Sequence, residues 1–103
     1  MGKVYTLSYL PTFEEDMATV RDYIAIDLAN PIAALRLIED TEIAIQKRLS
    51  NPEGFKPYKS KNDRKQSYYR INIRNYSVFY VVIGNIMEVR RFIYAKRNIQ
   101  KII

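Results

Sequence analysis

The side chains best suited to chemistry in this chain are arginines and tyrosines, because the sequence contains neither histidine nor cysteine. Without histidine the usual group for proton transfer near neutral pH is missing, and without cysteine there is no thiolate or disulfide. A zinc site built from carboxylates alone would be unusual, so we expect no metal and no other cofactor. The basic and aromatic residues that draw attention lie in the last third of the chain: Arg70, Arg74, Arg90, Tyr94, Lys96 and Arg97.

The chain of 103 residues is basic, with 17 Lys and Arg against 11 Asp and Glu and a net charge of +6. This balance favours polyanionic surroundings or an acidic protein partner, unless the charge serves solubility alone. Residues 55–67 are polar and predict a basic loop, whose cations are Lys56, Lys59, Lys61, Arg64 and Lys65. No run approaches the ~20 apolar residues of a membrane span, and the N-terminus lacks the features of a secretory signal. We therefore expect a cytoplasmic protein without membrane contact.

The elements that must position these residues begin with a strand over residues 4–9 and continue with two helices. Thr12 to Glu15 forms a capping-box pattern that predicts the start of the first helix, and Asn30 with Pro31 predicts the start of the second. Their apolar stripes are Phe13, Met17, Val20, Ile24 and Leu28, then Ala34, Ile38, Ile45 and Leu49. Because the connection between the helices is short, we expect an antiparallel helical hairpin.

The second half of the chain has the period-two alternation of strands. Residues 69–74, 76–83 and 86–94 predict three strands, and Gly84-Asn85 predicts a two-residue hairpin turn between the last two. The order is strand, helix, helix and three strands. It predicts one α+β domain over residues 1–103, an antiparallel sheet of about four strands with the N-terminal helical hairpin packed on one face.

The Gly84-Asn85 turn also predicts which side chains share a face. A two-residue turn places Ile83 opposite Ile86, and an unbroken ladder extends this register along both strands. The face toward the helices then carries Tyr76, Val78, Tyr80, Val82, Met87, Val89, Arg91 and Ile93. The open face carries Ser77, Phe79, Val81, Ile83, Ile86, Glu88, Arg90, Phe92 and Tyr94, joined by Arg70, Asn72 and Arg74, with Lys96 and Arg97 at its margin.

Two consequences follow from this register. Arg91 is expected on the helix side, where Asp16 or Glu39 could pair with it. The open face should hold a sizeable apolar patch, and such patches usually mark a binding site. Its members are Phe79, Val81, Ile83, Ile86 and Phe92. The tail residues Ile99, Ile102 and Ile103 are expected to cover part of it, and a partner segment the rest.

The ordered set of motifs resembles the RelE/ParE toxin superfamily over nearly the whole chain. In the helical half the matching segments are Asp22-Tyr23-Ile24-Ala25, Asn30-Pro31-Ile32-Ala33-Ala34 and Asn51-Pro52-Glu53-Gly54, which resemble the ParE branch. In the strand half they are Tyr69-Arg70-Ile71, Asn75-Tyr76-Ser77-Val78-Phe79-Tyr80 and Arg91-Phe92-Ile93-Tyr94-Ala95-Lys96-Arg97-Asn98, which are similar to both branches. The resemblance implies a sheet that carries a helical hairpin.

It also implies a toxin of a type II toxin–antitoxin system. RelE-like members cleave messenger RNA in the ribosomal A site without a metal, and ParE-like members poison DNA gyrase. Both are neutralised by an antitoxin, here expected to have an acidic, disordered C-terminal segment that folds onto the apolar and basic surface. The tyrosine and arginine residues favour the endoribonuclease, with gyrase inhibition as the alternative and a binding module that retains only the antitoxin as a third.

The RelE-like reading assigns roles to individual residues. Arg70 matches a basic catalytic position, Arg97 matches a terminal catalytic arginine, and Tyr94 stands where relatives have His or Tyr; Arg90 joins them on the predicted face. Ser77 departs from the pattern, because RelE-like enzymes commonly have arginine there. The expected RNA contacts are Lys56, Lys59, Lys61, Arg64, Lys65, Arg74 and Lys96. The expected antitoxin contacts are Phe79, Val81, Ile86 and Phe92.

Overall fold

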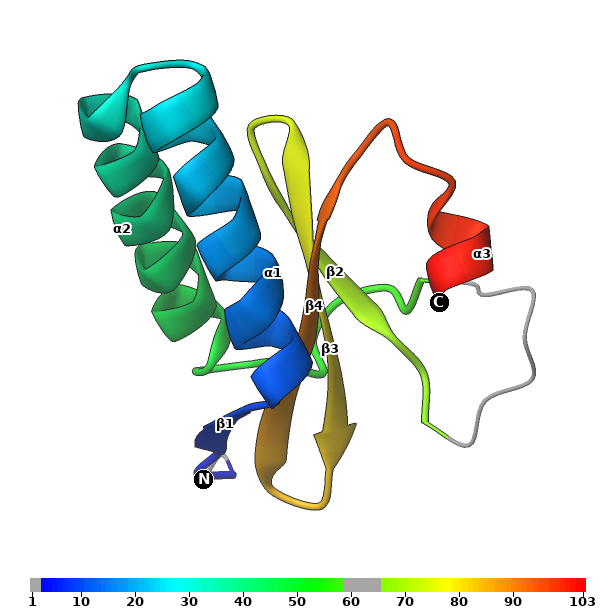
Figure 1. The fold of residues 1–103 in the computed structure, drawn as a ribbon. Helices are drawn as coiled ribbons and strands as arrows, with labels where there is room; N and C mark the ends of the chain where they lie inside the picture. The colour runs from blue at the N-terminus through cyan, green and yellow to red at the C-terminus, as the bar shows by residue number, and fades with distance from the viewer. Residues whose placement is uncertain (1–2, 59–65) are drawn as a thin grey trace.

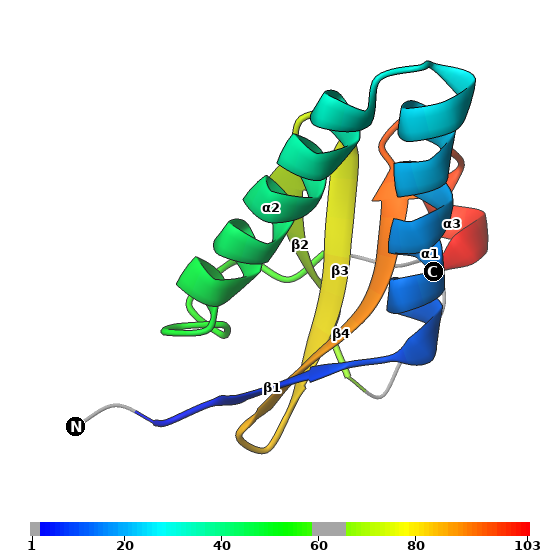
Figure 2. The same ribbon diagram turned by 60° about the vertical axis from the view of Figure 1, so that its left-hand side comes forward.

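The computed structural model describes residues 3–58 and 66–103 as an α+β fold (Figure 1). The elements are β1 (Thr6–Tyr9), α1 (Pro11–Asp22), the π-helical turn η1 (Tyr23–Asp27), α2 (Pro31–Arg48), β2 (Tyr69–Ile73), β3 (Tyr76–Ile83), β4 (Ile86–Tyr94) and α3 (Ile99–Ile102). The hairpin of α1 and α2 covers one face of the sheet, and α3 lies on the opposite side (Figures 1 and 2). The predicted element order and the predicted helical hairpin are therefore confirmed. In the part of the chain that the structure describes, no helix combines the length and apolar character of a membrane span.

The sheet has the strand order β1-β4-β3-β2 and is mixed. The pairs β2–β3 and β3–β4 are antiparallel, whereas β1 runs parallel to β4, with Thr6 opposite Ile86 and Tyr9 opposite Val89. The prediction of a purely antiparallel sheet is wrong in this respect. A parallel pair needs a long crossover, and the helices with β2 and β3 supply it between β1 and β4.

The two helices begin in different ways. Asn30 caps α2 as predicted, since its Oδ1 accepts a hydrogen bond of 3.1 Å from the backbone N–H of Ala33. The capping box predicted at Thr12 is wrong, because α1 already begins at Pro11 and Leu10 makes no side-chain cap. Proline at the first helical position has a φ that suits a helix start, so the helix begins one residue before the threonine.

Two apolar clusters cover the two faces of the sheet. The first cluster lies between the sheet and the helical hairpin and consists of Phe13, Met17, Leu37, Ile45, Ile71, Ile73, Val78, Tyr80, Met87, Val89 and Phe92. The second cluster lies between the sheet and α3 and consists of Tyr68, Phe79, Val81, Ile93, Ile99 and Ile103. Ile99 and Ile103 thus cover the opposite face, as the tail was expected to do.

A β-bulge interrupts the ladder between β3 and β4. The turn at Gly84 pairs Ile83 with Ile86 as predicted, and Gly84 has a φ of +62°. Beyond the break, Tyr80 lies opposite Val89, Phe79 lies opposite Arg91, and Arg90 has no partner in the ladder. One extra residue reverses the alternation of faces from that point onward, so the unbroken register that we predicted is wrong for the end of β4.

Candidate functional site

Arg70 lies on the face of the second cluster, as predicted. Its Nε donates hydrogen bonds of 2.8 Å to Oδ1 of Asn72 and 2.8 Å to Oγ of Ser77. Its guanidinium carbon lies 5.6 Å from the ring centroids of both Tyr58 and Phe79, within the range of cation–π attraction. The strand alternation of β2 and the aromatic residues beneath it therefore hold this cation in a defined place.

Arg90 occupies the bulge position and contacts the same face. Its Nε donates a 2.9 Å hydrogen bond to Glu88, and its guanidinium carbon lies 5.8 Å from the ring centroid of Tyr68, a member of the second cluster. Burial alone would lower the pKa of Arg90, but hydrogen bonding to Tyr68 and Glu88 outweighs burial and raises that pKa. Arg70 and Arg90 thus form a basic surface on the second cluster, suited to a carboxylate or phosphate.

Tyr94 does not join this basic surface. Because the bulge reverses the faces, its ring lies 5.5 Å from the ring of Tyr76, which in turn stacks on Phe92 of the first cluster. The prediction that Tyr94 shares a face with Arg70 is therefore wrong. Arg97 is exposed in the turn after β4, where its backbone N–H donates to the carbonyl of Tyr94.

The residues predicted to contact RNA do not share one surface in the structure. Arg74 was expected on the open face, but it lies in the turn after β2 with a φ of +52° and forms an ion pair with Asp40 of α2. This placement corrects the prediction, because a residue in a turn leaves the strand alternation. Lys56 and Lys96 are exposed. The remaining predicted contacts, Lys59, Lys61, Arg64 and Lys65, lie outside the described residues.

The four residues expected to bind the antitoxin have different surroundings. Phe79 and Val81 lie on the expected face but are fully buried in the second cluster, under Ile99 and Ile103 of the C-terminal segment. Phe92 was expected on the open face and instead belongs to the first cluster, because the bulge turns it toward the helices. Ile86 is 40% exposed at the tip of the β3–β4 hairpin. Of the four, Ile86 is the one that a partner can reach without displacing other parts of the chain.

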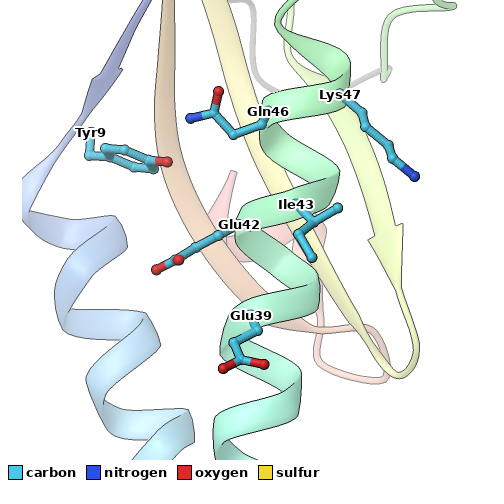
Figure 3. Close-up of a pocket in the computed structure, with 6 residues that line it drawn as sticks. All are labelled: Tyr9, Glu39, Glu42, Ile43, Gln46 and Lys47. Carbon is cyan, nitrogen blue, oxygen red and sulfur yellow. The ribbon is translucent and has the colours of Figure 1, made fainter.

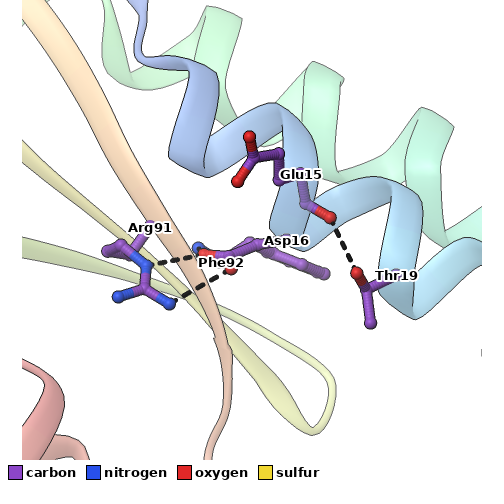
Figure 4. A network of polar contacts seen from close by, with 5 residues as sticks. All are labelled: Glu15, Asp16, Thr19, Arg91 and Phe92. Carbon is purple, nitrogen blue, oxygen red and sulfur yellow. Dashed lines mark hydrogen bonds and ion pairs between the residues drawn. The ribbon is translucent and has the colours of Figure 1, made fainter.

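Arg91 has a structural role at the edge of β4 (Figure 4). Its Nε and Nη2 donate to the two carboxylate oxygens of Asp16 at 2.7 and 3.1 Å, and the backbone N–H of Phe92 donates to the same carboxylate at 3.0 Å. Hydrogen bonding to Asp16 raises the pKa of Arg91. The expected pairing of Arg91 with Asp16 is confirmed, and it joins α1 to β4. The face predicted for Arg91 is wrong, however, because beyond the bulge it lies opposite Phe79 of the second cluster.

A groove that the sequence did not predict lies between the end of β1 and α2 (Figure 3). Its walls are formed by Tyr9 of β1 and by Glu39, Glu42, Ile43, Gln46 and Lys47 of α2, around a cavity of about 620 Å³. Burial, followed by the charges of Glu42 and Glu14, raises the pKa of Tyr9. Eight of the eleven acidic residues lie within residues 11–48, beside four basic ones, and this clustering is a signal that the sequence already contains.

The charges are therefore distributed unevenly: the helical hairpin is acidic and the rest of the chain is strongly basic. The four predicted catalytic residues are not gathered at one point, since Arg70 and Arg90 contact the second cluster while Tyr94 packs against Tyr76 near the helices. Within residues 3–58 and 66–103, no three carboxylates lie together as a metal site would require. The basic surface can bind an anion, but the predicted Tyr94 is not part of it; the tyrosines that contact its two arginines are Tyr58 and Tyr68.

Comparisons with known proteins agree with this architecture. A solved structure described as the chromosomal ParDE TA system from P. aeruginosa has a TM-score of 0.74 at 13% identity, covering 90% of this chain and 98% of that one. No curated protein sequence matches the chain. The family model of the ParE toxin of the type II toxin–antitoxin system parDE matches residues 7–99. The chain therefore belongs to the ParE toxin family and is a toxin of a type II toxin–antitoxin system.

Proposed function

We propose that this toxin arrests growth by binding and inhibiting DNA gyrase, without cleaving RNA. The observation that supports this proposal is the division of the predicted nuclease residues between two faces, with Arg70 and Arg90 on one and Tyr94 on the other. An acid–base step on RNA requires the proton-transferring group and the phosphate-binding group to contact the same few atoms. Inhibition by binding has no such requirement, and the ParE branch is the one that the resemblance associates with gyrase.

The test measures both activities of the full chain in parallel. We expect the purified toxin to inhibit supercoiling of relaxed plasmid by gyrase, and induction in cells to alter plasmid topology while messenger RNA stays intact. Toxin incubated with ribosomes and messenger RNA in the absence of gyrase is the control for effects that do not depend on gyrase. Messenger RNA cut at the A site during induction, together with normal supercoiling at saturating toxin, would refute gyrase inhibition and favour RNA cleavage instead.

The antitoxin of this system is proposed to bind the basic surface through an acidic segment that is disordered before binding. Arg70 and Arg90 supply charges that an acidic segment would neutralise, and Ile83 and Ile86 at the hairpin tip are each 40% exposed and can accept its apolar side chains. Phe79 and Val81 would contribute only if α3 moved, since they are fully buried.

This part of the proposal is tested by the affinity of the purified antitoxin for toxin variants. The double substitution Arg70→Ala and Arg90→Ala is expected to weaken binding at least about tenfold, because truncating charged groups in an interface typically costs about 2 kcal/mol or more. Arg21→Ala is the matched control, since this exposed arginine lies on α1 and pairs with Asp22. Equal affinities for the wild type and the double variant would place the antitoxin elsewhere.

A further inference from the structure

The α1–α2 connection, the β2–β3 turn and the end of β4 come together at one end of the molecule (Figures 1 and 2). Residues near these segments line a pocket with three tyrosines. Its walls include Tyr23, Tyr76 and Tyr94, with Asn75 beside them and apolar contacts from Val20 and Leu28. The cavity measures about 520 Å³. We name these residues the tyrosine pocket. It lies on the helix side of the sheet, away from the basic surface of Arg70 and Arg90.

The polar groups of this pocket are available to a ligand. Within the described residues, the hydroxyls of Tyr23, Tyr76 and Tyr94 and the side-chain amide of Asn75 make no hydrogen bond, and no buried side-chain polar atom is left unsatisfied. These groups therefore face water. Aromatic and apolar walls with a few convergent polar groups are the usual composition of a ligand site. Tyr23 and Tyr94, at 49% and 36% exposure, are also accessible from outside.

Irregular backbone surrounds the same pocket. The π-helical turn η1 begins at Tyr23, and Ala29 and Arg74, next to the lining residues Leu28 and Asn75, both have a φ of +52°. Within residues 3–58 and 66–103, Ala29 and Arg74 are the only two non-glycine residues with positive φ, and η1 is the only π-helical segment. Single π-turns and left-handed non-glycine residues are costly and are frequent at functional sites. Their placement around one cavity supports a role for that cavity beyond packing.

Two basic residues lie close to Tyr94 in the sequence. Lys96 and Arg97 follow Tyr94 within three residues and are exposed, and the backbone N–H of Arg97 donates to the carbonyl of Tyr94 at 3.0 Å. In the part of the chain that the structure describes, neither forms an ion pair. A ligand that combines a planar ring with a phosphate would match both the tyrosines and these cations.

We propose that the tyrosine pocket binds a base of single-stranded nucleic acid, which stacks on Tyr94 and Tyr23 and hydrogen-bonds to Asn75. Amide side chains form paired hydrogen bonds with base edges, and tyrosine rings stack on bases with little regard to sequence. An aromatic side chain of a protein could stack in the same way, but it would bring no phosphate for Lys96 and Arg97. The proposal does not depend on gyrase inhibition and concerns a different surface from the one assigned to the antitoxin.

The experiment titrates the full chain with fluorescent eight-nucleotide oligomers of dT, dA, rU and rA, with binding followed by anisotropy. We expect saturable binding that Tyr94→Ala and Tyr23→Ala each weaken about tenfold, within the range for loss of one stacked base. Tyr94→Phe retains the ring and should bind nearly as well as the wild type. Tyr5→Ala, just before β1, is the matched control, since Tyr5 contacts Glu53 and lies outside this pocket. Equal binding of DNA and RNA oligomers identifies the base alone as the ligand, whereas a preference identifies which sugar also contributes.

A second measurement identifies the occupant directly. In NMR titrations with AMP, UMP and dTMP, the ring protons of Tyr23, Tyr76 and Tyr94 are expected to shift, and those of Tyr5 to stay unchanged. Oligomer binding that is unaffected by both alanine substitutions would show attraction by charge alone and overturn the proposal. Ring shifts with N-acetyl-tyrosinamide but not with nucleotides would assign the pocket to a protein side chain and overturn it as well.

Discussion

The Ser77 hydroxyl accepts a 2.8 Å hydrogen bond from Nε of Arg70 and donates one of 3.0 Å to Oδ1 of Asn72. Ser77 is fully buried, on the face of the sheet that carries Arg70. It stands where RelE-like nucleases commonly have arginine. In this chain the position therefore holds a neighbouring guanidinium in place, instead of providing a charge of its own.

Replacing this serine should cost stability. Ser77→Ala removes a buried hydrogen bond to a charged group, and we expect the free energy of unfolding to fall by about 1 to 2 kcal/mol. Urea denaturation measures the change. Ser50→Ala is the control, because its exposed hydroxyl bonds the Lys47 carbonyl and its loss should change stability by less than about 0.5 kcal/mol. A Ser77→Ala protein as stable as the wild type would show that Asn72 alone positions Arg70.

The ion pair between Asp16 and Arg91 is expected to be worth more than an exposed one. Asp16→Ala removes three hydrogen bonds and leaves a partly buried guanidinium without its partner, so we expect a loss of about 2 to 3 kcal/mol in urea denaturation. Asp22→Ala breaks the exposed pair with Arg21 and should cost no more than about 0.5 kcal/mol. Similar losses of unfolding free energy in the two variants would contradict the conclusion that Asp16 stabilises the contact between α1 and β4.

The β-bulge predicts effects of very different size for two residues that an unbroken ladder would place on one face. Phe92 is 3% exposed and contacts Phe13, so Phe92→Ala should destabilise the fold by about 3 to 5 kcal/mol. Ile86→Ala should cost less than about 1 kcal/mol, because Ile86 is 40% exposed. Thermal unfolding monitored by circular dichroism compares them. A mild effect of Phe92→Ala would indicate the unbroken register.

Stability is expected to fall at high pH because of buried tyrosines. Burial raises the pKa of Tyr76 and of Tyr80 above the ordinary value of 10.0, although hydrogen bonding from Arg48 opposes this for Tyr80. The folded state then keeps these protons after the unfolded chain has lost them. The stabilisation is complete below pH 10 and is lost as the pH rises through the folded-state pKa values.

Urea denaturation at a series of pH values from 9 upward, with tyrosine ionisation followed at 295 nm, measures this dependence. Tyr80→Phe should lose stability less steeply with pH than the wild type. It should also be less stable at pH 9, because the Tyr80 hydroxyl donates a 2.7 Å hydrogen bond to the carbonyl of Pro52. Identical pH profiles in the two proteins would exclude Tyr80 as a source of the effect.

The sequence by itself determined the order of the elements and the two helices, because these depend on local signals. Asn30 and Pro31 define the start of α2, and Gly84 defines the β3–β4 turn, through interactions within a few residues. The pairing of Arg91 with Asp16 was also anticipated. The family resemblance followed from the same ordered motifs, and the family model matches residues 7–99.

The tertiary structure decided where the end of β4 points and how β1 pairs. The bulge at Arg90 inserts one residue into the ladder, so Phe92 turns into the first cluster and Tyr94 toward Tyr76. A strand alternates with period two, and one extra residue exchanges the faces of all that follow. No local pattern specifies that insertion, because it depends on how β3, α1 and β4 pack together. That single residue separates Tyr94 from Arg70 and creates the tyrosine pocket.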